Sequence, residues 1–432
     1  MYFRGSRVSQ GKSSVQIRVI RGEKSYLRTP ISMIMKKIAI LLFYCLSVFF
    51  ATANDGVFYA SGNQLIPITE TDISVKKEVL TINRVGNHLE VTVYYEFFNP
   101  VGEKELLVGF EAEAPYNGPD PMDFFPKHPH IQNFKVILNG EPLTFEIAHV
   151  ERGHYDDNGN YAPSKYYVNG HFQNWTKKQI EDTLIAWNYP GSMPIDYVFH
   201  FKAKFRPGLN IIQHTYDFDL SFSVEEEFHF PYILTAANRW ANHQIDDFTL
   251  NINLGNHVSF HLFPDFFKTA EEWTILGKGK TTIDTVWALG DGQKCPVFHI
   301  QEGSISFHKT NFHPEGELRI SQRRDWTVSA WSWSDNDGDY DAASILKCFK
   351  EQYMPISLPE ERKKEDLYYT IFSPKQRRIL KNLPFAYRGY VFKNKELRDY
   401  FESTEWYLPN TDYNGSMEAL SAGEKKWVDF WK

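Results

Sequence analysis

The sequence lacks the motifs that usually reveal a reaction. It contains no Gly-x-Ser-x-Gly elbow, no His-Glu-x-x-His pair and no Cys-x-x-Cys spacing, so the α/β-hydrolase pattern and the common zinc patterns are absent. The stretch LGKGKTT at 276–282 is an incomplete phosphate loop, because Thr274 stands where the first glycine is required. We therefore expect no cofactor, and the sequence identifies no catalytic residue.

Cysteine is also scarce. Of the three cysteines in the chain, Cys45 lies in an apolar segment near the N-terminus, which leaves Cys295 and Cys348 for the folded part. Two thiols allow at most one disulfide. Two unpaired buried thiols are an equal alternative, because a free cysteine packs like a small hydrophobic residue.

Long apolar runs are missing, with one exception at residues 33–53. This segment carries two lysines before an uncharged stretch and ends in Ala51-Thr52-Ala53. The stretch is shorter than the about 20 apolar residues that a membrane-spanning helix needs, and its small residues fit a signal-peptidase site. We predict a signal peptide cleaved after Ala53, an extracytoplasmic protein (periplasmic or secreted), and no transmembrane segment in the mature chain.

Basic residues are concentrated before the predicted cleavage site. Residues 1–32 are basic and aperiodic, so we expect them to be a non-native upstream extension; the alternative is a genuine extended basic region, and in both cases they lie outside the folded protein. Removing residues 1–53 takes away nine Lys or Arg and one acidic residue, which leaves 38 basic and 53 acidic side chains and a formal charge of −15. Such a chain repels phosphate backbones and has no basic stripe, so we expect no nucleic acid partner.

Residues 54–335 are predicted to be β-rich, because apolar residues recur at every second position, as in EVTVYYEFF (90–98). Asn139-Gly140 between two alternating runs predicts a hairpin, since both residues tolerate positive φ. We interpret Pro207-Gly208 in the same way. Many short strands joined by turns predict antiparallel sheets packed as a sandwich.

Helical spacing follows towards the C-terminus. We expect a helical linker at 336–361 and a small helical domain at 362–432. Capping side chains accept hydrogen bonds from the free N–H groups of a first turn, and they predict three helix starts at Ser373, Asn394 and Ser421. The predicted fold class is mainly β: an antiparallel β-sandwich-like N-terminal region with a small all-α C-terminal domain.

The segment KNLPFAYRGYVFKNKELRDYFESTEWY (381–407), with LSAGEKKWVDFW (420–431), resembles the YARHG domain, a small module of bacterial extracytoplasmic proteins. The naming motif falls on Phe385, Ala386, Tyr387, Arg388 and Gly389. Ala386 and Gly389 match, Phe385 replaces the tyrosine, and Tyr387 and Arg388 depart from the family's Arg-His. The family supplies no established activity to carry over. The β-rich part resembles uncharacterised secreted bacterial proteins in which such a region precedes this domain.

Two stretches could hold a ligand. RWANHQIDDF (239–248) has no apolar alternation and mixes polar with aromatic residues. This composition is typical of a loop that either holds a corner of the fold together or contacts a ligand. Its ligand-binding candidates are Arg239, Trp240, Asn242 and His243. DNDGDYD (335–341) places acidic residues at alternate positions, but the register of a calcium loop fails. We therefore expect no metal site, with Asp335, Asp337 and Asp339 as the weak candidates.

These observations predict a binding or interaction role in the bacterial envelope rather than catalysis. The expected partner is an unidentified envelope protein or a glycan. The alternative is a hydrolase acting on cell-wall or dietary glycan. An exposed tryptophan or tyrosine platform beside paired carboxylates would favour that alternative.

Overall fold

A computed structural model of the 432-residue chain describes residues 56–61, 64–112, 127–151, 154–155, 161–162, 165–167, 176, 178–179, 195–220, 226–286, 292–323, 342–356, 358 and 367–432. The expected upstream extension, the signal peptide and the acidic stretch 335–341 lie outside these residues. The chain divides into the units Met1–Ala51 and Thr52–Lys432, and the described residues all belong to the second unit. None of its described helices has the length and apolar character needed to cross a membrane.

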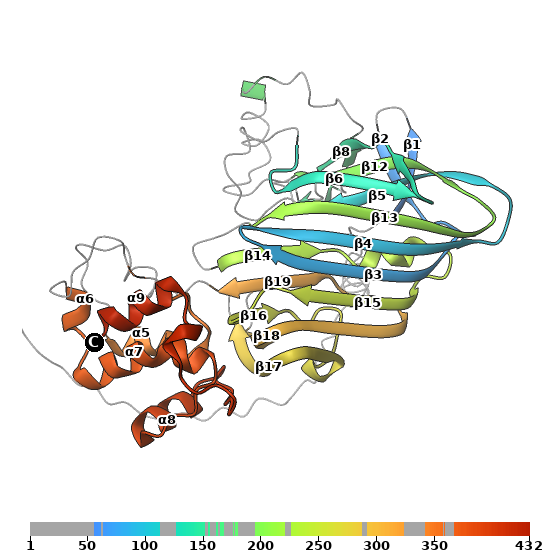
Figure 1. Ribbon diagram of the computed structural model, residues 1–432. Helices are drawn as coiled ribbons and strands as arrows, with labels where there is room; N and C mark the ends of the chain where they lie inside the picture. Colours follow the sequence, from blue (N-terminus) through green and yellow to red (C-terminus); the bar gives the residue numbers. More distant parts are fainter. Residues whose placement is uncertain are drawn as a thin grey trace, which may run out of the picture. The chain divides into compact units, whose positions relative to one another are not determined.

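The described residues between 56 and 323, which we call the β-body, are built almost entirely from strands (Figure 1). One group of strands closes a small barrel in the order β1-β2-β11-β8-β12-β5. The bounds of its members are β1 Gly56–Ser61, β2 Gln64–Ile68, β5 Lys104–Ala112, β8 Glu146–Glu151, β11 Lys165–Tyr167 and β12 Ile195–Phe205. A separate two-stranded sheet pairs β9 His154–Tyr155 with β10 Tyr161–Ala162.

The second sheet of the β-body has 11 strands in the order β14-β19-β16-β18-β15-β3-β4-β13-β6-β7, with β17 paired to β18. Its described neighbours are antiparallel except β3 and β15, which run parallel. The bounds are β3 Ser74–Val85, β4 His88–Asn99, β6 Ile131–Leu138, β7 Glu141–Leu143, β13 Gly208–Asp219, β14 Glu226–Tyr232, β15 Ile245–Asn253, β16 Val258–Leu262, β17 Trp273–Val286, β18 Gln293–Phe312 and β19 Leu318–Arg323.

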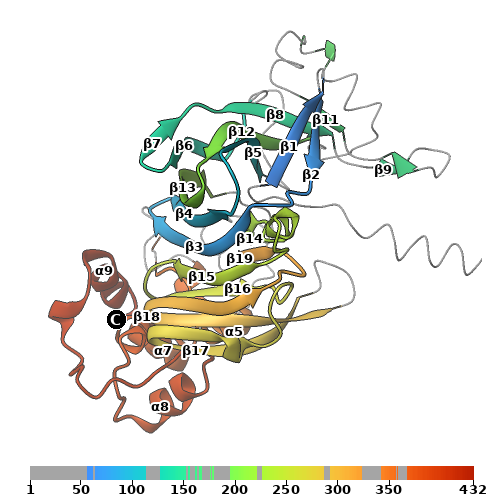
Figure 2. The same ribbon diagram turned by 90° about the vertical axis from the view of Figure 1, so that its right-hand side faces the viewer.

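The barrel and the large sheet share one hydrophobic core. Figure 2 shows the barrel strands β5, β8 and β12 beside β4, β6 and β13. Phe110 of β5 lies 5.6 Å from Phe134 of β6 and 5.2 Å from Tyr216 of β13, measured between ring centroids. The alternating apolar residues of both sheets meet in this core, as the period-two pattern predicts. The predicted mainly-β class with a small helical C-terminal part is confirmed.

The two predicted turns differ in outcome. Asn139 and Gly140 have φ values of 52° and 90°, and Leu138 pairs with Glu141, so this hairpin is confirmed. The hairpin predicted at Pro207-Gly208 is wrong. The strand before it, β12, pairs with β5 and β8, whereas β13 pairs with β4 and β6. The turn carries the chain from one sheet to the other, and alternation alone does not distinguish these cases.

The described residues between 342 and 432 form what we call the C-terminal module. Its helices are α5 Ala342–Glu351, α6 Leu367–Thr370, α7 Pro374–Tyr387, α8 Lys395–Glu402 and α9 Ala422–Phe430. The three predicted caps are confirmed, because Ser373, Asn394 and Ser421 each accept a hydrogen bond from a backbone N–H of the first turn. Helix α5 comes from the expected linker, yet its Phe349 lies in the same core as Trp406.

Candidate functional site

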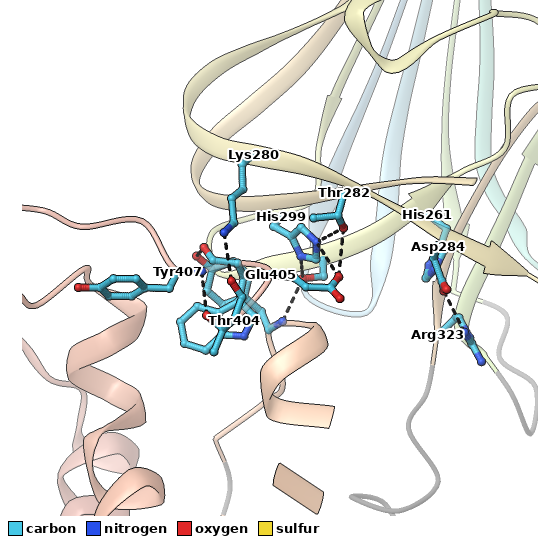
Figure 3. A network of polar contacts seen from close by, with 12 residues as sticks. His261, Lys280, Thr282, Asp284, His299, Arg323, Thr404, Glu405 and Tyr407 are labelled. Carbon is cyan, nitrogen blue, oxygen red and sulfur yellow. Dashed lines mark hydrogen bonds and ion pairs between the residues drawn. The ribbon is translucent and has the colours of Figure 1, made fainter. Parts of the chain in front are cut away.

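The C-terminal module contacts one face of β16, β17 and β18 through buried polar side chains (Figure 3). Each strand supplies one member of the central group, Ser259 from β16, Thr282 from β17 and His299 from β18. Ser259 and His299 are cross-strand partners, so their side chains project from the same face. We call this group and its contacts to the module the junction.

A chain of hydrogen bonds crosses the junction through His299. The Tyr353 backbone N–H donates to Ser259 Oγ at 2.9 Å, and Ser259 Oγ lies 2.8 Å from His299 Nδ1. On the other side of the ring, Nε2 lies 2.8 Å from Thr282 Oγ1, which donates to Glu405 Oε2 at 3.2 Å. Tyr353 and Glu405 belong to the module, so both ends of the chain are anchored outside the β-body.

This arrangement fits a neutral imidazole that carries its proton on Nε2. Ser259 Oγ accepts the Tyr353 N–H, so its own proton is directed to Nδ1, which therefore accepts. The Nε2–H then donates to Thr282, whose hydroxyl proton is directed to Glu405. His299 is 0% exposed. Burial lowers its pKa to about 3, and the charges of Lys280 and His261 act in the same direction.

Other contacts fasten the module to the same strands. Lys280 Nζ donates to the Thr404 carbonyl at 3.1 Å, and Gln301 Nε2 donates to the Tyr387 carbonyl at 2.8 Å. The His257 ring stacks on the Tyr387 ring, with centroids 5.8 Å apart and planes 24° from parallel. Burial lowers the pKa of Lys280 and of His257. The junction therefore combines hydrogen bonds with ring stacking and holds few charges.

A second polar group continues along the same face. His261 Nε2 lies 3.0 Å from Asp284 Oδ2, and Arg323 donates to that oxygen at 3.0 Å. The hydrogen bond from His261, helped by the Thr285 N–H and by Arg323, outweighs burial and lowers the pKa of Asp284 to about 2. His261 Nδ1 is buried, and no described residue pairs with it. An aspartate thus orients a histidine here, as it would in a proton-transfer site.

The thiols nearby are inert. Cys295 and Cys348 are both free and buried, which excludes the disulfide alternative. Burial raises the pKa of Cys295 to about 12. Its protonated thiol is directed to the Leu262 carbonyl at 3.3 Å, and a thiol in this state is a poor nucleophile.

The residues singled out in the C-terminal sequence lie inside the module. The Tyr387 hydroxyl donates to the Met354 carbonyl at 2.8 Å and accepts from the Met354 N–H at 3.2 Å, and burial raises its pKa. Arg388 donates to both Glu424 oxygens, at 2.6 and 2.8 Å, which ties the end of α7 to the start of α9. Gly389 has a φ of 76°, in the left-handed region that favours glycine. Ala386 is fully buried and Phe385 partly buried.

Comparison with protein families agrees with these contacts. Residues 362–432 match the YARHG domain. The C-terminal part of the chain is a YARHG domain. This domain is typical of extracytoplasmic proteins. The C-terminal module adds α5 and the segment after it to this domain, and we call it the YARHG module from here on. Its motif residues maintain the interior, and none of them is presented as a reacting group.

Similar solved structures are distant. A candidate nutrient binding protein from Legionella pneumophila subsp. pneumophila str. Philadelphia 1 is 16% identical, with a TM-score of 0.39, over 88% of this chain and 99% of that one. An M1 zinc metallopeptidase from Deinococcus radiodurans is 11% identical, with a TM-score of 0.22, over 60% of this chain and 45% of that one. No curated protein matches the sequence. Likenesses this weak carry no functional argument.

The candidates at 239–243 lie on one loop after η1 Thr235–Arg239, but they have different partners. Arg239 Nη2 donates to Glu111 Oε1 at 2.5 Å. Trp240 is 1% exposed and packs against Phe97, with ring centroids 4.5 Å apart. Both side chains thus connect the loop to strands of the β-body.

The remaining two candidates contact the backbone. Asn242 Oδ1 accepts the Val75 N–H at 3.2 Å, and Asn242 Nδ2 donates to the Val75 carbonyl at 2.9 Å. His243 is exposed, has a φ of 51°, and places Nδ1 2.8 Å from the Asn238 carbonyl. These are the contacts of a loop that ties a corner together. A ligand role for the four residues stays a prediction.

A small cavity lies beside the partner of Arg239. Glu111 lines a small cavity between the sheets together with His128, Tyr216 and Tyr232, and it has room for about one water molecule. In the part of the chain that is described, no cluster of three or more His, Cys, Asp or Glu could hold a metal ion. The weak candidates Asp335, Asp337 and Asp339 lie outside that part.

Sequence reasoning missed the junction. Its central residues come from three strands and from the segment after α8, and no fixed spacing links them. The available signal was the alternation of VSFHL (258–262) and PVFHI (296–300), which places Ser259, His261 and His299 on one face. That face is covered rather than solvated, because β16 and residues 295–301 of β18 are buried on both sides.

Proposed function

We propose that the protein acts outside the cytoplasm as an interaction protein that recognises another protein through the β-body. In this proposal residues 33–53 are removed as a signal peptide, the β-rich part spans 54–335, and a helical segment at 336–361 leads into the YARHG domain at 362–432. The module stays docked on the β-body through the junction. The YARHG domain and the apolar segment before Ala53 support the location.

The observation that carries the proposal is an apolar patch at the end of the large sheet. It consists of Phe98, Val101 and Leu209, whose exposed fractions are 40%, 47% and 55%. Phe98 and Leu209 are cross-strand partners, and Val101 lies just beyond the end of β4. Clustered exposed apolar side chains on a soluble surface often mark an interaction site.

Buried amides hold the patch in place. Asn99 is 0% exposed, and its amide donates to the carbonyls of Gly102 at 2.9 Å and Phe205 at 3.3 Å. Asn210 is also 0% exposed and bonds both the N–H and the carbonyl of Arg206. A surface fixed in this way loses little conformational entropy on binding.

A protein partner fits this surface better than a stacked sugar. The described tryptophans are all buried, namely Trp240, Trp273, Trp406, Trp427 and Trp431. In the residues whose burial is described, no tyrosine is exposed. From the sequence, we expect a sugar to stack on an exposed tryptophan or tyrosine, whereas a protein partner can bury the Phe98 ring together with the aliphatic side chains of Val101 and Leu209 inside a polar rim. The ion pair between Lys204 and Glu103, 2.7 Å long, supplies part of such a rim.

The experiment places a photo-crosslinking amino acid at Leu209 of the mature protein in cells. The matched control carries it at Val85, which is 43% exposed. Val85 ends β3, whereas Ser74, the residue that pairs with Phe98, begins it, so the control lies at the other end of the strands. We expect a discrete protein adduct from position 209 alone, and we expect Phe98→Ser to abolish it. Equal adducts from both positions, or an adduct that survives Phe98→Ser, would overturn the proposal.

Two companion measurements test the rest of the proposal. N-terminal sequencing of the exported protein should begin at Asn54, and retention of Lys36 and Lys37 would contradict the predicted cleavage. A glycan array probed with the mature protein should remain blank, whereas binding or turnover of a glycan would favour the hydrolase alternative.

A further inference from the structure

We propose that the junction is an acid-sensitive latch, in which the YARHG module stays docked on the β-body only while His299 is uncharged. This proposal is independent of the apolar patch and of the protein partner proposed for that patch. It depends on the hydrogen-bond directions at the junction and on the groups that surround the imidazole.

Protonation of His299 removes an acceptor that the junction needs. With a proton on Nδ1, that nitrogen becomes a donor to Ser259 Oγ, which already accepts the Tyr353 N–H. The Ser259 hydroxyl proton then has no acceptor on His299. A buried donor without a partner is unfavourable, and relief requires either loss of the proton or separation of the module from the strand.

The surroundings do not compensate a charged imidazole. Lys280 on β17 and His261 on β16 both disfavour the charge. Glu405 of the module is the nearest carboxylate, with Oε2 3.8 Å from Nε2. Burial raises the pKa of Glu405, and its hydrogen bond from Thr282 and the charge of Lys280 only partly oppose this. Glu405 therefore loses its charge at a higher pH than an ordinary glutamate, which weakens its ability to stabilise the imidazolium in acid.

His257 should also weaken docking of the module in acid. Its ring lies against Tyr387 and Tyr353 of the module, at 5.8 and 5.7 Å between centroids. Burial lowers its pKa, and Arg388 acts in the same direction against the carboxylates Glu424 and Glu302. Both histidines face the module, so separation of the module returns both to water.

The sign of the pH dependence follows from linkage. A histidine whose pKa is lower when docked stabilises the docked state above its ordinary pKa of about 6.5, and this stabilisation is lost as the pH falls. With a docked pKa of about 3, His299 alone should weaken the docking equilibrium about 30-fold between pH 7.5 and pH 5. Glu405 acts in the opposite direction, but its side chain is 44% exposed, so it offsets only part of this change.

The experiment measures hydrogen exchange of the Tyr353 amide in the mature protein at pH 7.5 and pH 5, corrected for the intrinsic exchange rate. This amide donates to Ser259 across the junction, so its protection reports docking. We expect protection to fall at pH 5 in the wild type. His299→Gln keeps a donor for Thr282 and an acceptor for Ser259 but cannot ionise, so it should remove most of the pH response. His88→Gln, at the start of β4, should respond like the wild type.

Direct titration of the wild type by NMR keeps the test independent of any variant. The His299 ring should remain neutral down to pH 5.5 for as long as the Tyr353 amide is protected. A ring that titrates near pH 6.5 while that amide stays protected would overturn the latch. So would a His299→Gln protein that folds at pH 7.5 and keeps the full pH response.

Discussion

Gly389 is the position at which the structure makes the sharpest energetic prediction. It follows Arg388, the C-cap of α7, and has a φ of 76°. A Cβ there would meet the Leu408 carbonyl oxygen at 2.4 Å and the Asn410 backbone nitrogen at 2.8 Å. A left-handed backbone costs an L-residue about 1–2 kcal/mol, and forced overpacking adds about 1–3 kcal/mol. We therefore expect Gly389→Ala to lower the free energy of unfolding by about 2–5 kcal/mol.

Substitutions at two other glycines separate the cost of the left-handed backbone from the cost of overpacking. Gly140 has a φ of 90° but open space around a Cβ, so Gly140→Ala should show the strain alone, about 1–2 kcal/mol. Gly423 in α9 has neither strain nor a close contact, since the nearest atom to its Cβ would be 3.9 Å away. Gly423→Ala should therefore stabilise the protein by up to about 1 kcal/mol.

The assay is urea unfolding of the mature protein and the three variants, followed by tryptophan fluorescence. A Gly389→Ala protein that unfolds like the wild type, or no more easily than Gly140→Ala, would refute the close approach of residues 408–410. A change in the denaturant slope would instead show that the substitution altered the compactness of the native or denatured state or ended two-state unfolding.

The remaining predictions concern the YARHG module and metal. Trp406→Ala should cost about 3–5 kcal/mol in urea unfolding, because the ring is fully buried and its N–H donates to the Phe349 carbonyl at 2.7 Å. Burial alone would raise the pKa of Glu424, but hydrogen bonds from Arg388 and Ser421 lower it overall. Arg388→Met should therefore destabilise the protein at pH 7 and lose much of that difference below about pH 4 in pH-dependent melts, as Glu424 protonates. A fragment spanning 342–432 should melt cooperatively and above a fragment spanning 362–432, which lacks α5 of the same core. EDTA should leave the melting temperature of the mature protein unchanged, because no structural zinc spacing occurs in the sequence.

Local features of the fold could be predicted from the sequence because their causes are local. The caps at Ser373, Asn394 and Ser421 depend on one side chain and the next three backbone N–H groups. Asn139-Gly140 forms its turn because both residues tolerate positive φ. In α8, Leu397 and Phe401 are four residues apart, so they lie on one helix face, and both are buried in the core of the YARHG module.

Features that depend on distant partners could not be predicted in this way. The parallel pairing of β3 with β15 joins segments that are far apart in the chain, and nothing in either strand specifies it. Pro207-Gly208 looks like a hairpin turn, yet β13 finds its partners in β4 and β6. In the sequence, His299 looks like a polar strand residue on a solvated face. The residues that cover it, Tyr353 and Glu405, are more than 50 positions further along the chain.

The junction also links docking of the YARHG module to its own stability. The Tyr387 carbonyl accepts a hydrogen bond from Gln301 of the β-body, and the Tyr387 hydroxyl donates to the Met354 carbonyl within the module. The ring centroids of Tyr387 and Trp406 are 4.8 Å apart. Glu405, which ends the hydrogen-bond chain from His299, is the neighbour of Trp406 in the chain. A contact that exists only in the docked and folded state stabilises both docking and folding. Acid that charges His299 should therefore loosen the packing around Trp406 as the module separates, rather than release an unchanged rigid body.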